Sequence, residues 1–317
     1  MIADNLLLHL ITQFNMHYKK SITAVAVVIT SFVCLSFSIG KRNTAFLKIG
    51  HRGTRGLMPE NTLPSMFKAI ELGCNTIEFD VHITKDGQVV VYHDSSVNPE
   101  YTQLADGSDI MPGERKKYTF YQMNYSEIRQ LKIGSKKYPA FPEQQSIASY
   151  APLLSELIDS VEAFTTTHKY PKVNYLLEIK SSKETDGVEQ PVPAVFVEKV
   201  MAALKSKKLL ERLVIQSFDM RPLQVLNNKY PKVKLGFLTG DNKVSIEQNL
   251  ALLGFKPQFY NPHYGMVNTD MVNTLHAKGI KICPWTVNEL EDINKTLAFD
   301  VDGVITDYPD RLTKALK

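Results

Sequence analysis

Two carboxylates and a histidine alternate along one short apolar run of this 317-residue chain. The run 76–82 reads TIEFDVH, and its period of two places Glu78, Asp80 and His82 on one face of a strand, opposite the apolar residues. Neighbouring carboxylates in a buried place repel each other and lose their hydration, so they need a cation or a proton between them. A hard divalent metal ion held by oxygen atoms is the simplest solution.

A second run repeats this arrangement further along the chain. In LLEIK, residues 176–180, Glu178 and Lys180 share one face, so a third carboxylate and an ammonium are predicted to point into the same site. Either motif alone is typical of an exposed strand with paired charges. Two such motifs on strands that otherwise read as buried favour a functional site instead.

Two histidines each close an apolar run, His51 after 46–50 and His93 at the end of 89–93. A lone histidine at a strand end is usually structural. Two of them beside three carboxylates fit an acid/base pair, because imidazole exchanges its proton near neutral pH. Arg52 follows His51, and its planar guanidinium fits a phosphate or a carboxylate. The residues do not assign acid and base between the two histidines.

From residue 45 onward, short β-branched runs alternate with amphipathic stretches, which is the rhythm of a parallel sheet buried on both faces. Strands are predicted at 46–50, 76–81, 89–93, 175–179, 213–217, 234–238, 258–261, 281–286 and 303–306, and helices at 63–72, 153–166, 193–205, 271–277 and 289–297. The pattern favours an α/β fold, one TIM-type (β/α)8 barrel over 45–317, with one of these strands outside the barrel. The polar span 98–149 is predicted to be an insertion after the third strand.

The composition excludes several classes of protein. The chain is 44% hydrophobic and 22% charged, which is typical of a globular protein rather than a disordered one. A net charge of +4 without a long basic run does not indicate binding to nucleic acid. Three cysteines without CxxC or Cys/His spacing provide neither a disulfide framework nor a thiolate zinc site. Any metal would therefore be held by oxygen.

Residues 1–40 differ from the rest of the chain and are predicted to be a signal peptide or a membrane anchor. The segment 21–40 carries no charge, and it lies between a Lys-Lys pair and a Lys-Arg pair. Small residues near its end fit cleavage, whereas its apolar length also fits an uncleaved span that associates with the membrane. We expect an exported protein, periplasmic or secreted, or alternatively one anchored facing outside the cytoplasm. Met16 is an alternative start of the chain.

An ordered set of short motifs extends from about residue 50 to the C-terminus. The motifs are HRG at 51–53, PENT at 59–62, ExD at 78–80, DG at 86–87, HD at 93–94, LEIK at 177–180, QSF at 216–218, WTVN at 285–288 and DGVITD at 302–307. No single motif is specific, but the ordered set resembles the glycerophosphodiester phosphodiesterase family. The resemblance implies a TIM barrel with an insertion at 98–149. It also implies metal-assisted hydrolysis of a glycerophosphodiester, such as glycerophosphocholine or glycerophosphoethanolamine, to glycerol 3-phosphate and an alcohol.

By motif position, the resemblance also implies roles for individual residues. The metal ligands would be Glu78, Asp80 and Glu178, and the acid and base would be His51 and His93. Arg52 and Lys180 would hold phosphate oxygens, Glu60 would orient the site or join the metal shell, and Trp285 would form an apolar wall against the substrate. We expect Ca²⁺ rather than Mg²⁺, because an exported protein works in a calcium-containing compartment.

Two alternatives for the function remain. A phospholipase of the same barrel superfamily, acting on intact lipids, would use nearly the same residues. A non-catalytic glycerophosphodiester-binding protein would keep the pocket, although the presence of both histidines and all three carboxylates counts against it. The nucleophile is either water or the 2-hydroxyl of the glycerol group.

Overall fold

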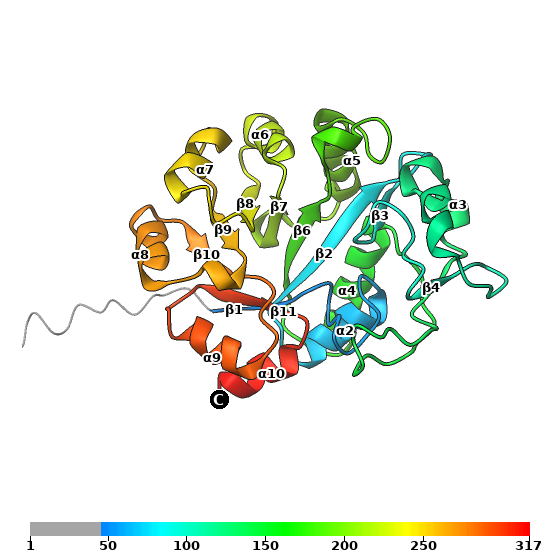
Figure 1. The fold of residues 1–317 in the computed structure, drawn as a ribbon, viewed down its shortest axis with the longest axis horizontal. Helices are drawn as coiled ribbons and strands as arrows, with labels where there is room; N and C mark the ends of the chain where they lie inside the picture. The colour runs from blue at the N-terminus through cyan, green and yellow to red at the C-terminus, as the bar shows by residue number, and fades with distance from the viewer. Residues whose placement is uncertain (1–45) are drawn as a thin grey trace, which may run out of the picture. The chain divides into compact units, whose positions relative to one another are not determined.

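The computed structural model describes residues 46–317, whose main feature is a barrel of eight parallel strands. In sheet order these strands are β10 (Lys281–Ile282), β9 (Phe259–Pro262), β8 (Lys234–Thr239), β7 (Leu213–Ser217), β6 (Asn174–Ile179), β2 (Thr76–Ile83), β1 (Leu47–Gly50) and β11 (Gly303–Thr306). At the remaining seam, the Asp302 N–H donates to the Ile282 carbonyl (2.9 Å) and the Ile305 N–H donates to the Pro284 carbonyl (3.0 Å). The predicted TIM-type barrel is therefore confirmed (Figure 1).

Helices cover the outside of the barrel (Figure 1). They are α2 (Leu63–Glu71), α4 (Leu154–Thr167), α5 (Pro193–Leu204), α6 (Met220–Lys229), α7 (Ile246–Leu253), α8 (Thr269–Ala277), α9 (Leu290–Leu297) and α10 (Pro309–Ala315). The apolar faces of these helices pack on outward-pointing strand residues, and Ile77, Phe79 and Val81 of β2 all belong to this main core. Because side chains alternate along a strand, Glu78 and Asp80 point to the barrel interior.

β3 (Val89–Val91) is the predicted strand that lies outside the barrel, where it pairs antiparallel with the end of β2. The tight turn between the two strands contains Gly87, whose φ of 76° favours glycine. The Tyr92 N–H then donates to the carbonyl of Asp80 (3.0 Å). The hairpin therefore returns the chain so that His93 emerges beside the functional residues of β2.

The span 98–149 contains short elements of its own. They are β4 (Thr102–Gln103), η1 (Pro112–Tyr118), η2 (Phe120–Gln122), α3 (Tyr125–Ile128) and β5 (Lys132–Ile133), and β4 pairs antiparallel with β5. Tyr101 and Phe120 join Tyr92 in an apolar cluster separate from the main core, with the Phe120 and Tyr92 ring centroids 4.8 Å apart. This cluster fixes the span next to the segment that follows β3.

Two details of the predicted element pattern were wrong. The strand predicted at 281–286 ends at Ile282. Pro284 follows closely, and a proline has no N–H to donate to a neighbouring strand, so regular pairing stops there. The helices α6, α7 and α10 were not predicted, although Ile246, Leu250 and Leu253 of α7 have helical spacing.

The N-terminal predictions lie outside the described residues. These are the signal or anchor segment 21–40 and the alternative start at Met16. Within residues 46–317, no helix is long and apolar enough to cross a membrane.

Glu162 of α4 ties this helix to the first residues of β6. Its carboxylate accepts hydrogen bonds from the Tyr175 hydroxyl (2.6 Å) and the Lys172 ammonium (3.1 Å), and it pairs with the Arg212 guanidinium (2.8 Å). Burial raises the pKa of Glu162, but these three donors outweigh it and lower the pKa to about 2. These contacts stabilise the start of β6, whereas Glu178 lies near its other end.

Candidate active site

The three predicted metal ligands come from neighbouring strands. Glu78 and Asp80 lie on β2, Glu178 lies near the end of β6, and the parallel register places Asp80 opposite Glu178. All three are buried, with exposed fractions of 1%, 0% and 6%. One oxygen atom of each carboxylate lies within 4.8 Å of the others. The structure therefore brings these groups together inside the barrel, and we call them the carboxylate cluster.

The carboxylate cluster fits a hard divalent cation. The Oε1 atom of Glu78 is buried and has no hydrogen-bond partner among the described residues. Burial and the charges of Asp80 and Glu178 raise the pKa of Glu78 well above its usual value. Burial also acts to raise the pKa of Asp80, but nearby cationic groups, Lys180 foremost, hold it well below its usual value. A cation among carboxylate oxygens would give the orphaned oxygen a partner and offset the repulsion.

Two side chains contact the cluster directly. Lys180 Nζ lies 2.6 Å from Glu178 Oε1 and 3.1 Å from Asp80 Oδ1. Asn61 donates its side-chain N–H to Asp80 Oδ2 (2.8 Å), and its side-chain oxygen accepts the Asp80 N–H (3.3 Å). Asn61 has a φ of 57°, which asparagine tolerates better than most residues. Lys180 therefore presents its ammonium beside the carboxylates, while Asn61 fixes the orientation of Asp80.

Arg52 lies between the carboxylate cluster and Glu60. Its backbone N–H donates to Glu78 Oε2 (2.8 Å), and its Nη1 donates to Glu60 Oε1 (2.7 Å). The Nε atom lies 3.5 Å from Asp80 Oδ2. Glu60 also accepts the hydroxyl of Tyr101 at 3.2 Å and is only 4% exposed. The structure thus places Glu60 behind Arg52, where it orients the guanidinium.

His51 forms a pair with Asp307, which directly follows β11. His51 Nδ1 lies 2.7 Å from Asp307 Oδ1, and Asn288 donates to the other carboxylate oxygen at 2.8 Å. Because a carboxylate accepts at Nδ1, this nitrogen carries the ring proton and Nε2 keeps its lone pair. Nε2 faces the cluster, 4.0 Å from Glu78 Oε2. Burial lowers the pKa of His51 to about 4 although Asp307 raises it, so the ring is neutral at pH 7.

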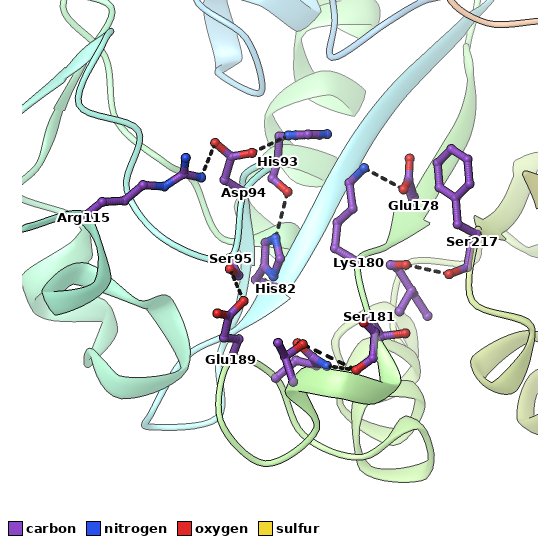
Figure 2. A pocket seen from close by; sticks show the side chains of 15 residues that line it. His82, His93, Asp94, Ser95, Arg115, Glu178, Lys180, Ser181, Glu189 and Ser217 are labelled. Atoms are coloured by element: carbon purple, nitrogen blue, oxygen red, sulfur yellow. Dashed lines mark hydrogen bonds and ion pairs between the residues drawn. The ribbon is translucent and has the colours of Figure 1, made fainter. Parts of the chain in front are cut away.

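His93 forms a second imidazole–carboxylate pair. Its Nδ1 lies 2.7 Å from Asp94 Oδ1, and Arg115 of η1 pairs with the other oxygen of Asp94 at 2.8 Å. His82 Nε2 lies 3.0 Å from the His93 carbonyl. A carbonyl oxygen can only accept, so His82 Nε2–H donates this hydrogen bond, and burial lowers the pKa of His82 to about 4. Both the ring and the backbone of His93 are therefore held in place (Figure 2).

These groups meet in a cavity of about 220 Å³, which we call the inner cavity. Its polar wall includes His51, Arg52, Glu78, His93, Glu178 and Lys180. Trp285 forms an apolar wall of this cavity. Its ring is held in place because the indole N–H donates to the Asn261 carbonyl (2.9 Å) and Phe218 packs edge-on, with 5.2 Å between the ring centroids. Glu60 is the predicted substrate-binding residue that does not line this cavity.

Sequence reasoning missed several residues that shape the site. Asp307, Asp94 and Asn61 lie within the recognised motifs, but they had no role until the structure showed their partners. For Asp94, the adjacency to His93 is a signal that could have been used. Asp307 offers no such signal, because 256 positions separate it from His51.

Comparison with known proteins identifies the family. The model of the glycerophosphoryl diester phosphodiesterase family matches residues 51–311. A glycerophosphodiester phosphodiesterase of Caldanaerobacter subterraneus is 30% identical over 272 residues, which cover 86% of this chain and 98% of that protein. One from Bacillus altitudinis is 30% identical over 267 residues, or 83% of this chain and 95% of the other.

A solved structure from Silicibacter pomeroyi, which carries the same family name, superposes with a TM-score of 0.77. It is 30% identical and covers 87% of this chain and 94% of its own. The chain therefore belongs to the glycerophosphoryl diester phosphodiesterase family, as its motifs predicted, and is a phosphoric diester hydrolase.

Proposed function

We propose that this chain hydrolyses glycerophosphodiesters to glycerol 3-phosphate and an alcohol, using a divalent metal ion and two histidines. The observation that carries the proposal is the inner cavity, in which His51 and His93 meet Glu78 and Glu178 of the carboxylate cluster. Hydrolysis of a phosphodiester needs cationic groups for the charge on the phosphoryl oxygens and a proton donor for the departing alkoxide. The cavity supplies both. A protein that only bound the diester would need no acid/base pair.

Arg52 and Lys180 are the proposed phosphate contacts. Both line the inner cavity and carry fixed positive charge at the edge of the carboxylate cluster. Glu60 and the Asp80 carboxylate hold the Arg52 guanidinium in one orientation, which reduces the entropy lost when a phosphate binds. Trp285 then contacts the apolar face of the glycerol group.

Glu78, Asp80 and Glu178 are the proposed ligands of the metal ion. When bound, such an ion supplies Lewis-acid stabilisation of the negative charge that develops on the phosphoryl oxygens. We propose calcium, because this ion accepts carboxylate oxygens in irregular geometry and is available outside the cytoplasm. The buried, unpartnered Oε1 of Glu78 supports a cation at this position.

His51 is the proposed general base and His93 the proposed general acid. Because His51 Nδ1–H donates to Asp307, Nε2 keeps a free lone pair and can take the proton of the attacking hydroxyl. As the bond from phosphorus to the leaving oxygen breaks, His93 gives a proton to the alkoxide. Asp94 and Arg115 hold the ring of His93 on its side of the cavity.

The direct test is the release of glycerol 3-phosphate from a panel of glycerophosphodiesters, with and without a chelator. We expect turnover that excess chelator abolishes and that calcium or magnesium restores. An intact phospholipid serves as the comparison substrate. Full turnover after extended dialysis against chelator would overturn the metal assignment, and turnover of the phospholipid alone would favour the phospholipase alternative.

We also propose that the chain is exported through 21–40. The support is the uncharged length of this segment between two basic pairs. Cell fractionation followed by N-terminal sequencing tests the idea, with a mature chain expected to begin near Ile39 or Lys41. The unprocessed chain in the cytosol would refute export, and retention in salt-washed membranes would indicate an uncleaved anchor.

A further inference from the structure

A second cavity, the outer cavity, adjoins the inner one and opens to solvent. Its volume is about 300 Å³, and His93, Glu178, Lys180 and Phe218 line both cavities. Much of the rest of its lining comes from three segments: residues 181–190 after β6, residues 94–95 after β3, and Arg115 of η1 (Figure 2). The outer cavity therefore lies where the span 98–149 meets a loop of the barrel.

The two histidines differ in how they meet these cavities. His51, Arg52 and Trp285 line only the inner cavity, whereas His93 lines both. In an in-line displacement at phosphorus, the nucleophile and the leaving oxygen lie on opposite sides. If His51 activates the nucleophile in the inner cavity, as the proposed function requires, the leaving alcohol lies on the His93 side. The outer cavity is the space available for it.

One carboxylate in the outer cavity has no cationic partner. Asp94 is paired with His93 and Arg115, and Glu178 is paired with Lys180. Glu189 accepts only the Ser95 hydroxyl (2.6 Å), and no ion pair to it exists among the described residues. A carboxylate without a cationic partner attracts a positively charged group with hydrogens to donate.

The loop that carries Glu189 is held in place before any ligand binds. The side chain of Gln190, 2% exposed, donates to the Ser182 carbonyl (2.6 Å) and accepts the Thr185 hydroxyl (2.9 Å). Asp186 pairs with Arg221 of α6. The Glu189 carboxylate is thus positioned by the fold, and little entropy is lost when it contacts a ligand.

We propose that the outer cavity binds the leaving alcohol and that Glu189 selects alcohols that carry a protonated amine. This inference rests on the proposed function and adds a substrate class to it. A primary ammonium two carbons from the leaving oxygen, as in glycerophosphoethanolamine, donates to Glu189. A neutral polyol, as in glycerophosphoglycerol, donates hydroxyl hydrogen bonds to the same carboxylate but brings no positive charge to it.

The test compares kcat/KM for glycerophosphoethanolamine and glycerophosphoglycerol in the wild type and in Glu189→Gln. The variant keeps the shape and the acceptor for Ser95 but loses the charge. We expect the preference for the amine substrate to fall by about tenfold, with little change for the neutral substrate. Glu184→Gln is the matched control, because it removes a carboxylate from the same loop that does not line the cavity. Glu184→Gln should show the same preference for the amine substrate as the wild type.

Ionic strength provides a second, independent readout. Glu189 is partly exposed, so salt should weaken the wild-type preference and leave that of Glu189→Gln unchanged. An identical substrate ratio in both proteins, or a ratio insensitive to salt in the wild type, would overturn the role of Glu189 while leaving the proposed function intact. If neither diester were hydrolysed by the wild type, the proposed function itself would fail.

Discussion

Glu78→Gln should be more stable than the wild type without calcium and less stable than the wild type when calcium is added. In chelator, the variant should be more stable than the wild type, because one of three crowded carboxylate charges is gone. Two unit charges 4.8 Å apart repel by about 3 kcal/mol at an effective dielectric constant near 20. The loss of attraction to Arg52 offsets part of this gain, although the glutamine oxygen still accepts the Arg52 N–H. The expected net gain is about 1–2 kcal/mol, or roughly 2–6 °C in melting temperature.

In excess calcium, the order should be the opposite. An ion present at a hundred times its dissociation constant adds about 2.7 kcal/mol to the folded state that binds it. Glu78→Gln loses a ligand and should gain much less. Differential scanning calorimetry in chelator and in calcium measures both shifts. Glu71→Gln, an exposed carboxylate of α2, is the control and should melt like the wild type in both buffers. A variant less stable than the wild type in chelator, or equal calcium shifts, would refute the reasoning.

Three further predictions test other parts of the molecule. His93→Ala should lose far less activity on a nitrophenyl phosphodiester, whose leaving group needs no proton, than on glycerophosphocholine, whereas His51→Ala should lose about the same factor on both. Equal losses for both variants on both substrates would contradict the division into acid and base. Asp307→Asn should lower kcat on the order of 10²-fold with little change in KM, since it disturbs the ring proton of His51 rather than substrate binding. A change confined to KM would count against this. Glu162→Gln should lower the free energy of unfolding by about 1–2 kcal/mol at pH 7 in urea titrations. Because the folded-state pKa of Glu162 is lowered from 4.5 to about 2, its contribution is complete above pH 4.5, and the difference should vanish as the pH falls towards 2. Glu198→Gln, which removes an exposed ion pair with Lys229, should change stability by less than about 0.5 kcal/mol, and a similar loss in both variants would contradict the argument.

Local signals predicted part of the site: periodicity along two strands and short motifs that resemble a known family. Alternation along β2 and β6 is a property of a few consecutive residues, so the shared face of Glu78 and Asp80 could be read directly. The barrel followed from the repetition of such runs. Helix α7, which was not predicted, could have been found as well, because Ser245 and Gln248 form a capping box at its start.

The rest depends on contacts between distant segments. Nothing near Asp307 in the sequence indicates that it meets His51, because the pairing follows from barrel closure. Glu189 lies in a polar loop without periodicity, and only the position of Ser95 shows which way its carboxylate points. Pairing partners, and therefore the charges left without a partner, are properties of the folded chain.

The pairing of β1 with β11 has a consequence for when activity can appear. His51 follows the first barrel strand and Asp307 follows the last, so the proposed base acquires its orienting carboxylate only after all eight barrel strands have been synthesised. A nascent chain on the ribosome lacks this pair even if its other strands have already paired. The same holds for a chain that crosses a membrane unfolded. Loss of the last strand by premature termination or proteolysis would remove the pair in the same way. If His51 is the base, hydrolysis therefore has to wait until the barrel has closed, wherever the chain folds.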